Sequence, residues 1–201
     1  IEACLVGSEM CIRDSRGPDT KGVIDTILEL RERTRVVSLM GNHEIMMLEA
    51  RDSGVALARW MGEGVGGSST VASYGGDSLQ SIPVQHWEFI EGGLPFHESE
   101  RHLFVHANAA SHLALEDQDP FMLFWEKFRK VPPHRSGKTM VCGHTAQKGG
   151  VPANLGHAIC IDTWAYGGQW LTALDVQSGT YWQCNEAGEE RSDNVSRHLS
   201  A

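Results

Sequence analysis

Clusters of basic residues and long apolar segments are both missing from this sequence. Its 201 residues include 17 Lys and Arg against 26 Asp and Glu, so the formal net charge is −9. Proteins bind nucleic acids and anionic membranes through runs of Lys and Arg, and the sequence has no such run. No apolar stretch reaches the ~18 residues that a membrane-spanning helix needs. We therefore expect neither a nucleic-acid partner nor a membrane partner.

Two further features that the sequence lacks bear on where in the cell the protein is located. The five cysteines are an odd number and lack the spacing of a disulfide framework. No segment combines a basic start with a short apolar stretch in the manner of a secretory signal peptide. The predicted location is therefore the cytoplasm. With 41% hydrophobic and 21% charged residues, the chain has the composition of a globular protein with one sizeable core.

The segment Gly41–Glu44 (Gly-Asn-His-Glu) indicates a function most clearly. It directly follows the apolar run 36–40, which is typical of a buried strand. A strand that ends in a glycine turn and leads into a helix presents the amide of Asn42 and the imidazole of His43 at a sheet edge. The start of the helix that follows favours anions there. This arrangement predicts a site for metal and phosphate.

Two more histidines follow apolar runs in the same way. His106 ends the run 103–105, and His144 follows the run 140–143. Because the carboxyl ends of parallel strands share one edge of a sheet, we expect Asn42 and these two histidines to converge there. Neutral imidazole and an amide oxygen suit a borderline divalent cation such as zinc, iron or manganese.

Each of these histidines also has a purely structural interpretation. A single histidine after a strand is more often packed than a ligand, but three such placements beside Gly or Ala favour a ligand role. His43 and Glu44 also look like the start of a zinc-protease helix. That chemistry needs a second histidine four residues later on the same helical face, and Met47 occupies that position. A peptidase of this kind is therefore excluded.

Five short motifs occur in a particular order along the chain. They are Arg16–Asp19 (Arg-Gly-Pro-Asp), Gly41–Glu44, Val105–Ala107 (Val-His-Ala), Gly143–Thr145 (Gly-His-Thr) and Ile161–Thr163 (Ile-Asp-Thr). In this order the chain resembles the bacterial serine/threonine protein phosphatases of the PPP type, which belong to the calcineurin-like metallophosphoesterase superfamily. The resemblance extends from about residue 16 to about residue 183.

The resemblance implies an α/β fold in which two mixed β-sheets pack face to face between flanking helices. The phosphoesterase domain is expected over residues 16–185. Residues 1–15 lack any hairpin signal, cap or period and are expected to be a foreign segment, so that the chain is N-terminally truncated and lacks the first strand of the fold. The polar residues 186–201 have no apolar period and are expected to be a disordered tail.

The resemblance also implies two divalent metal ions, with manganese preferred and iron or zinc as alternatives. Asn42, His106 and His144 match the family's ligands of the second metal. His43 matches the family's general acid, and Arg16 matches the arginine that grips the substrate phosphate. Two such cations can hold a bridging hydroxide and aim it at phosphorus.

The family's ligands of the first metal are missing from this chain. Counting back from Arg16, Ile12 and Ser15 stand at the positions of two family aspartates, and Asp14 would serve only after a shift in register. We therefore expect half of the metal centre to be absent. The activity of the truncated chain itself is left open.

Two weaker candidates for substrate binding are Lys127 and Tyr166. Lys127 stands near the position of a second family arginine, but it lies in the segment 120–128, whose aromatic residues predict an amphipathic helix packed in the core. Tyr166 follows the Ile161–Thr163 motif, where it would line the substrate cleft or simply pack. The Gly/Ser-rich segment 62–70 lacks the lysine of a nucleotide-binding loop and is predicted to be a linker.

The predicted function is hydrolysis of phosphate monoesters, with phosphoserine and phosphothreonine in proteins as the first substrate class. A metal-bound hydroxide is expected to attack, and His43 to protonate the leaving group. A dinucleoside polyphosphate hydrolase uses the same motifs and is one alternative. A non-catalytic fragment that binds a single metal is another. The expected partner is a phosphorylated protein or a phosphorylated small molecule.

Apolar periodicity and turn residues also predict the order of the elements. Helices are expected over residues 18–33, 44–51, 55–61, 83–89 and 121–128. Strands are expected over residues 36–39, 94–96, 102–105, 139–142, 157–161, 170–174 and 180–183.

Overall fold

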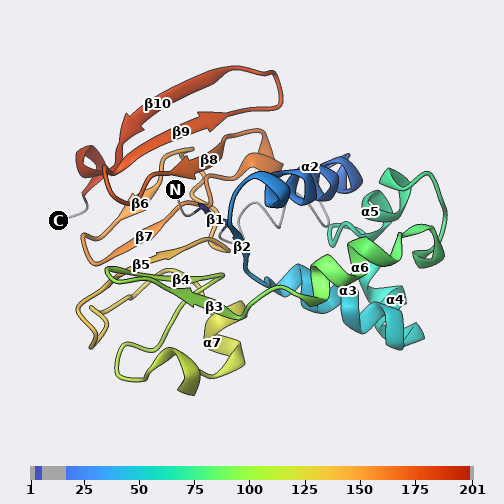
Figure 1. The fold of residues 1–201 in the computed structure, drawn as a ribbon, viewed down its shortest axis with the longest axis horizontal. Coiled ribbons are helices and arrows are strands. Elements are labelled where there is room, and N and C mark those ends of the chain that lie inside the picture. Colours follow the sequence, from blue (N-terminus) through green and yellow to red (C-terminus); the bar gives the residue numbers. More distant parts are fainter. Residues whose placement is uncertain (1–2, 6–16, 200–201) are drawn as a thin grey trace. The chain divides into compact units, whose positions relative to one another are not determined.

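The computed structural model describes residues 3–5 and 17–199, and these form two compact units (Figure 1). Unit 1 holds the described residues up to Leu94, and unit 2 begins at Pro95. Within the described ranges, every helix is too short or too polar to cross a bilayer.

Several of the sequence predictions fall on residues outside this description. They concern Arg16, the matched positions Ile12 and Ser15, and the nearby Asp14. The phosphate-binding role of Arg16 and the foreign origin of segment 1–15 therefore stay predictions.

Unit 1 contains a short parallel sheet. β1 (Ala3–Leu5) pairs with β2 (Val36–Ser38), and beyond β2 the chain continues into a parallel bridge between Leu39 and Leu94. A paired strand within the segment 1–15 differs from the expectation that the first strand is lacking. The physical reason is that a ladder of three residues is too short to produce a recognisable period in the sequence.

Among the described residues of unit 1, five helices enclose one apolar core. They are α2 (Thr20–Arg33), α3 (Asn42–Asp52), α4 (Gly54–Trp60), α5 (Gly67–Ser73) and α6 (Val84–Glu91), with the 3-10 turn η2 (Leu79–Ser81) before α6. In α2, the Asp19 carboxylate caps the N-terminus by accepting from the N–H of Gly22 (2.9 Å). Ile24 and Ile27 face the core, to which all five helices contribute. The amphipathic period of the sequence thus predicts α2 correctly.

The helix α5 corrects the prediction that residues 62–70 form a linker. Gly67 opens this helix against the indole of Trp60, where a Cβ would come within 2.5 Å of a ring atom. Thr70 and Val71 of this helix are buried. Packing on the core, rather than the poor helix propensity of Gly and Ser, therefore stabilises this element.

Unit 2 is built on a five-stranded mixed sheet with the order β3-β4-β5-β7-β6. Its strands are β3 (Phe96–Glu98), β4 (His102–Val105), β5 (Thr139–Cys142), β6 (Ala153–Asn154) and β7 (Ala158–Cys160). The three central strands run parallel, and both edge strands run antiparallel to them. The central strands are mostly buried, which explains why they read as continuous apolar runs in the sequence.

A second sheet in unit 2 is antiparallel and has the order β10-β9-β8 (Figure 1). Its strands are β8 (Leu171–Leu174), β9 (Thr180–Cys184) and β10 (Glu190–Asn194), and the turn η5 (Val195–His198) follows. The α/β class with two sheets and helices is confirmed. The second sheet was expected to be mixed, but each hairpin-type connection along β8 to β10 makes it antiparallel throughout.

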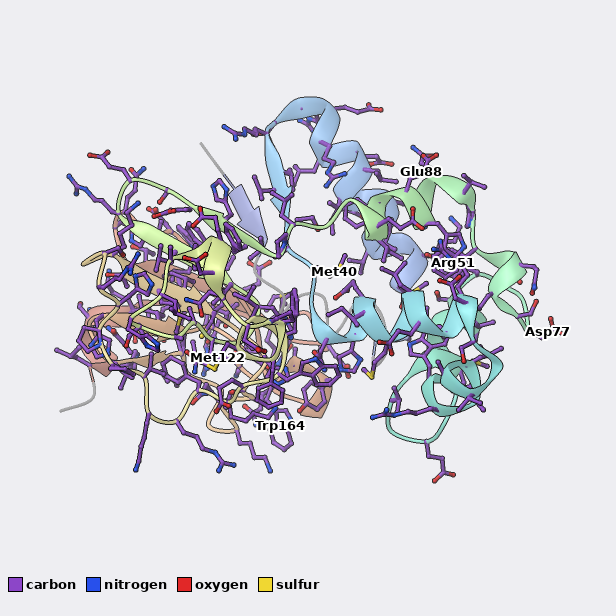
Figure 2. All side chains as sticks on the ribbon, turned by 90° about the horizontal axis from the view of Figure 1, so that it is seen from below. Met40, Arg51, Asp77, Glu88, Met122 and Trp164 are labelled. Carbon is purple, nitrogen blue, oxygen red and sulfur yellow. The ribbon has the colours of Figure 1, made fainter. Side chains whose placement is uncertain are left out.

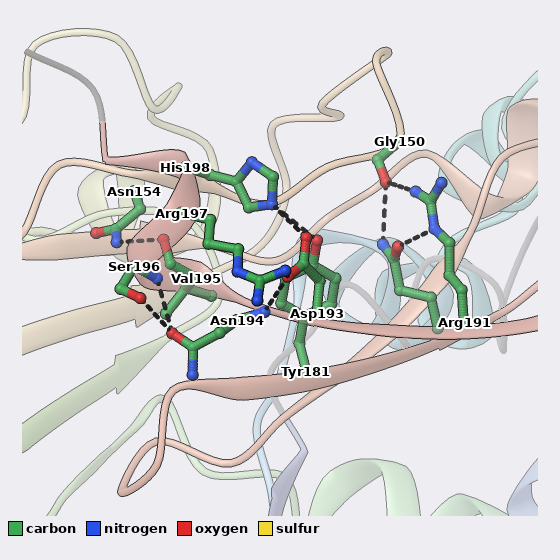
Figure 3. Close-up of polar contacts among 11 residues, drawn as sticks. Gly150, Asn154, Tyr181, Arg191, Asp193, Asn194, Val195, Ser196, Arg197 and His198 are labelled. Atoms are coloured by element: carbon green, nitrogen blue, oxygen red, sulfur yellow. Dashed lines mark hydrogen bonds and ion pairs between the residues drawn. The ribbon is translucent and has the colours of Figure 1, made fainter.

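The prediction that residues 186–201 are disordered is wrong for the part of that range which the structure describes. β10 pairs with β9 over five residues, and the side chain of Arg191 donates to the carbonyl of Gly150 (2.6 Å) and to Gln183 Oε1 (2.7 Å) (Figure 3). The Arg191 guanidinium also lies 4.1 Å from the ring centroid of Trp170. These contacts are polar or made by the backbone, so they leave no apolar period in the sequence.

The end of this segment is held by a second polar cluster (Figure 3). His198 Nε2 lies 3.2 Å from Asp193 Oδ2 and 3.1 Å from the hydroxyl of Tyr181. The N–H of Asn194, with the side chain of His198 contributing further, lowers the pKa of the Asp193 carboxyl. The contribution of this contact to stability is present at neutral pH and is lost as the pH falls through the lowered pKa.

Asn154 connects β6 of the five-stranded sheet to the turn η5 and is buried. Its side-chain N–H donates to the carbonyl of Val195 (2.9 Å), and its side-chain oxygen accepts from the N–H of Gly156 (2.8 Å). We expect Asn154→Ala to lower the free energy of unfolding of unit 2 by about 1–3 kcal/mol, since it leaves a buried carbonyl without its donor. Urea denaturation monitored by hydrogen exchange of the β7 and β9 amides would measure this loss. The exposed Gln85→Ala serves as the control, and equal stability of both variants would contradict the prediction.

Candidate functional site

The carboxyl ends of β4 and β5 bring two of the predicted ligands together. These strands are parallel neighbours in the sheet, and His106 follows the last residue of β4, while His144 stands two residues after β5. The Nε2 atom of His106 lies 3.2 Å from the Nδ1 atom of His144, and the ring centroids are 5.0 Å apart. His106 is fully buried. The convergence expected from the strand-end pattern is therefore observed for this pair.

His144 has an unusual backbone conformation. Its φ is +62°, in the left-handed region that residues other than glycine rarely adopt. Such a conformation costs about 1–3 kcal/mol and persists where surrounding contacts hold it. Here the N–H of Gly143 donates to the carbonyl of His106 (2.9 Å), and Lys127 Nζ donates to the carbonyl of His144 (3.3 Å). The turn therefore directs an imidazole toward His106 at the expense of local stability.

The hydrogen bond of His144 to a main-chain carbonyl determines which ring nitrogen carries the proton. Its Nε2 lies 3.1 Å from the carbonyl oxygen of Trp125, which can only accept. Nε2 is therefore the protonated nitrogen in the neutral ring, and the lone pair of Nδ1 points at His106. Two imidazole nitrogens that face one another at 3.2 Å either share a proton or both face a cation. A carbonyl that fixes the tautomer is the usual support of a metal-binding histidine.

Residues 125–128 form the support of His144, which corrects the prediction of a helix over 121–128. The helix α7 (Pro120–Phe124) ends after little more than one turn, and Trp125 leaves it with φ −131°. The chain then meets the His144 turn, where the N–H of Phe128 donates to Thr145 Oγ1 (2.8 Å). The main-chain hydrogen bonds with the His144 turn stabilise this segment more than another turn of helix would. They involve main-chain groups, so the pattern of side chains in the sequence does not predict them.

Two buried thiols lie behind the histidine pair. Cys142 and Cys160 are register neighbours in β5 and β7, and Cys160 Sγ donates to the carbonyls of Gly143 and Thr145 (3.4 Å each). Burial, together with a hydrogen bond to Cys160, raises the pKa of the Cys142 thiol well above its usual range. Cys142 is thus a neutral thiol, so imidazole nitrogen is the donor that this end of the sheet offers to a cation. Cys184, the last residue of β9, is exposed because it lies on the face of that strand which alternates outward with Trp182.

Asn42 and His43 belong to unit 1, where they form the first turn of α3. Both are buried, each with 5% of its surface exposed. The predicted helix over 44–51 therefore begins two residues earlier than expected. The carboxylate of Glu44 accepts a hydrogen bond from the N–H of Gly41 (2.9 Å), which is one half of a capping box. The N–H groups of a first helical turn attract anions, as the sequence predicts for this segment.

Glu44 gives a direct test of how this turn is held. It is fully buried, so Glu44→Ala leaves the N–H of Gly41 without its acceptor. We expect the free energy of unfolding to fall by about 1–3 kcal/mol, whereas Glu44→Gln, which keeps an acceptor oxygen, should lose less than about 1 kcal/mol. Chemical denaturation measures both values, and the amide shift of Gly41 in NMR spectra reports the turn itself. Equal losses in both variants would show that the hydrogen bond is unimportant.

The weaker candidates occupy different surroundings. Lys127 is exposed, and its ammonium group contacts the His144 carbonyl, so it supports the site from outside. Tyr166 lies in the turn η4 (Ala165–Gly167) with its ring edge-on to Trp164, at 6.3 Å between centroids. This contact agrees with the packing interpretation of Tyr166. Its part in substrate binding stays a prediction.

Two groups near the end of the sheet had little or no signal as individual residues in the sequence. Asp162 is buried, and its carboxylate accepts from the N–H of Trp164 (3.2 Å). Only its place in the Ile161–Thr163 motif could have indicated it. The carbonyl of Trp125 had no signal at all, because every residue type carries the same main-chain oxygen.

Two ring nitrogens make an incomplete ligand set for a cation. Among residues 3–5 and 17–199, no three His, Cys, Asp or Glu side chains are close enough together to hold a metal ion. The described part of unit 2 therefore fits one side of a metal site, with neutral nitrogen donors suited to manganese, iron or zinc. The ligand role expected for Asn42, which belongs to unit 1, stays a prediction.

Comparisons with known proteins identify the fold. No family model matches the chain, and no curated protein matches it in sequence. Among solved structures it is similar to one described as "a putative diadenosine tetraphosphatase", with a TM-score of 0.55 over 90% of this chain and 76% of that chain. The chain shares the fold of that protein. The sequence identity is 16%, so the similarity concerns the fold and the α/β architecture expected from the five motifs.

Proposed function

We propose that this chain is a metal-dependent phosphoesterase that hydrolyses phosphate monoesters, with phosphoserine and phosphothreonine in proteins as its main substrates. The observation that carries the proposal is the pair His106 and His144, whose ring nitrogens converge at the carboxyl ends of two parallel strands. The strained backbone of His144 supports it, because strain of this kind gathers at functional sites. The fold similarity is consistent with this class of reaction.

His106, His144 and Asn42 are the residues that would hold a divalent cation. When bound, the cation would neutralise charge on the phosphate oxygens and lower the pKa of a water molecule, and manganese is the first candidate with iron or zinc as alternatives. The chain itself supplies the tautomer of His144, since the Trp125 carbonyl keeps the proton on Nε2 and leaves Nδ1 able to bind.

His43 is proposed to protonate the leaving oxygen of the substrate. It lies in the first turn of α3, where main-chain N–H groups favour a phosphate, so its imidazole and the anion would meet at one helix end. General-acid catalysis of this kind contributes about 10²–10⁴-fold to the rate. Arg16 is proposed to bind the phosphate through two parallel hydrogen bonds, a geometry that lysine does not provide.

Hydrolysis of dinucleoside polyphosphates is the second candidate. The specific observation in its favour is the description of the similar solved structure as a diadenosine tetraphosphatase. Both reactions break a bond between phosphorus and oxygen, so the same residues would serve them.

The test is to measure turnover of both substrates by the full chain in manganese, zinc and iron. We expect phosphate release from a phosphoserine peptide to exceed cleavage of diadenosine tetraphosphate by at least about tenfold in kcat/KM, a difference of about 1.4 kcal/mol in barrier. The reverse order would support the second candidate. Turnover of neither substrate, in any of the three metals, would favour a non-catalytic metal-binding fragment.

A further inference from the structure

Unit 1 contains a cavity of about 530 Å³ that no part of the proposed chemistry uses. It lies between the end of α3, the start of α4, the turn η2 and α6. Its apolar lining includes Leu57, Met61, Ile82 and Trp87, which pack from the outer side onto the core of this unit or belong to it. A volume of this size is in the range of sites that enclose a bulky side chain or a small ligand.

The rim of the cavity is acidic. Asp52 and Asp77 both line it, and Asp77 is labelled in Figure 2. Asp77 is exposed, and no described residue forms an ion pair or hydrogen bond with it. The single lining cation, Arg51, is already engaged. Its guanidinium forms an ion pair with Glu91, lies 3.5 Å from Asp52 Oδ1, and stacks at 5.1 Å over the ring of Trp87. The carbonyls that end α3 add partial negative charge at the same place.

The apolar lining and the acidic rim of the cavity together favour a ligand that has both an apolar and a cationic group. A bulky apolar side chain would fill the cavity, and a neighbouring Lys or Arg would find carboxylates at the rim. The net charge of −9 favours a cationic partner over an anionic one. A peptide segment with an apolar side chain flanked by basic residues has this combination.

The helix α3 relates this cavity to the candidate general acid. His43 lies in its first turn and Asp52 is its last residue. At a rise of 1.5 Å per residue the two are about 14 Å apart along the helix axis. An extended peptide covers about 3.3 Å per residue, so it needs no fewer than about four residues to connect the two positions.

We propose that the cavity docks an unphosphorylated segment of a protein substrate. The segment carries a bulky apolar side chain next to Lys or Arg, and the phosphorylated residue lies at least about four residues away in the sequence. The distance in sequence between the docked side chain and the phosphorylated residue is argued from the proposed phosphatase function. Docking of the peptide in the cavity does not depend on that function.

Docking is tested first without catalysis. The probe is a fluorescein-labelled, unphosphorylated peptide with one Phe between Lys and Arg, and its affinity is measured by fluorescence anisotropy. We expect Asp77→Lys and Leu57→Glu each to raise Kd by about tenfold or more. Glu29→Lys, the same charge change on an exposed position of α2, should change Kd by less than about twofold.

Several outcomes would overturn the docking proposal. They are equal affinity in all variants, equal binding of a peptide in which Asp replaces Lys and Arg, or a dimer of the chain that Leu57→Glu dissociates in sedimentation. Asp77→Lys keeps the test decisive if Leu57→Glu unfolds, because Asp77 is exposed and is not part of the apolar core of unit 1.

The spacing is tested with phosphoserine peptides whose docking residues lie about two, five or eight residues from the phosphate. We expect KM to fall by about tenfold from the shortest to the longer spacings, and Asp77→Lys to remove this gain without changing kcat on p-nitrophenyl phosphate. A KM that does not change with this spacing would overturn the spacing prediction.

The two proposals fail in different ways. Peptide binding without release of phosphate from any substrate would refute the phosphatase function and leave docking intact. Phosphate release without peptide binding would refute docking alone.

Discussion

Replacing His144 with Ala is expected to abolish most metal binding and activity of this chain. His144 Nδ1 and His106 Nε2 are the two nitrogens that converge at the strand ends, so the variant removes half of this donor pair. Loss of a residue that merely supports a ligand costs about 10–100-fold in metal affinity or activity, and loss of a ligand should cost more. Manganese per protein, measured by elemental mass spectrometry after gel filtration, and phosphate release from a phosphopeptide would both report it.

The exposed His112→Ala is the matched control for this experiment. A full metal complement in His144→Ala would show that His144 is not a ligand. A further variant separates function from stability. His144→Gly relieves a positive φ that costs about 1–3 kcal/mol, so its free energy of unfolding should rise while it loses metal as the Ala variant does. A loss of stability in His144→Gly would mean that the imidazole contacts matter more to the fold than the backbone strain.

Replacing His43 with Asn is expected to lower turnover of a phosphoserine peptide by about 10²–10⁴-fold while leaving the metal content unchanged. The reason is that serine leaves as a strongly basic alkoxide, which needs a proton from the enzyme. The p-nitrophenolate ion leaves without one, so p-nitrophenyl phosphate should be affected far less by the same variant. Steady-state kinetics with both substrates, together with metal analysis, make the comparison.

Two results would assign His43 differently. An equal loss of metal would make it a ligand, and equal losses on both substrates would show that it orients the phosphate rather than protonating the leaving group. His43 is buried at the start of α3, so a fold control by circular dichroism accompanies the kinetics.

Some of the fold could be predicted because its cause is local. The strands β4 and β5 occupy the ranges expected from apolar runs, since strands buried on both faces need apolar residues at every position. The helix α2 begins two residues later than expected, after its Asp19 cap, and ends as expected. The convergence of His106 and His144 could also be predicted, because parallel neighbours end at the same edge of a sheet.

Other parts could not be predicted because their cause lies elsewhere in the chain. The helix α5 consists largely of poor helix formers and depends on packing against Trp60. The early end of α7 depends on hydrogen bonds with the turn at His144 and Thr145. The polar strand β10 depends on a partner strand and on the Arg191 contacts. In each case the decisive interaction joins residues that are distant in sequence.

The sequence by itself determined which kinds of donor this protein offers and at which strand ends they stand, because residue type and the period of buried strands are local properties. The tertiary structure decided how His144 is used. The carbonyl of Trp125 selects its tautomer, and the neighbouring contacts hold its backbone at a positive φ. Neither effect leaves a trace in residue type, since main-chain oxygens are the same everywhere and their positions follow only from the folded chain.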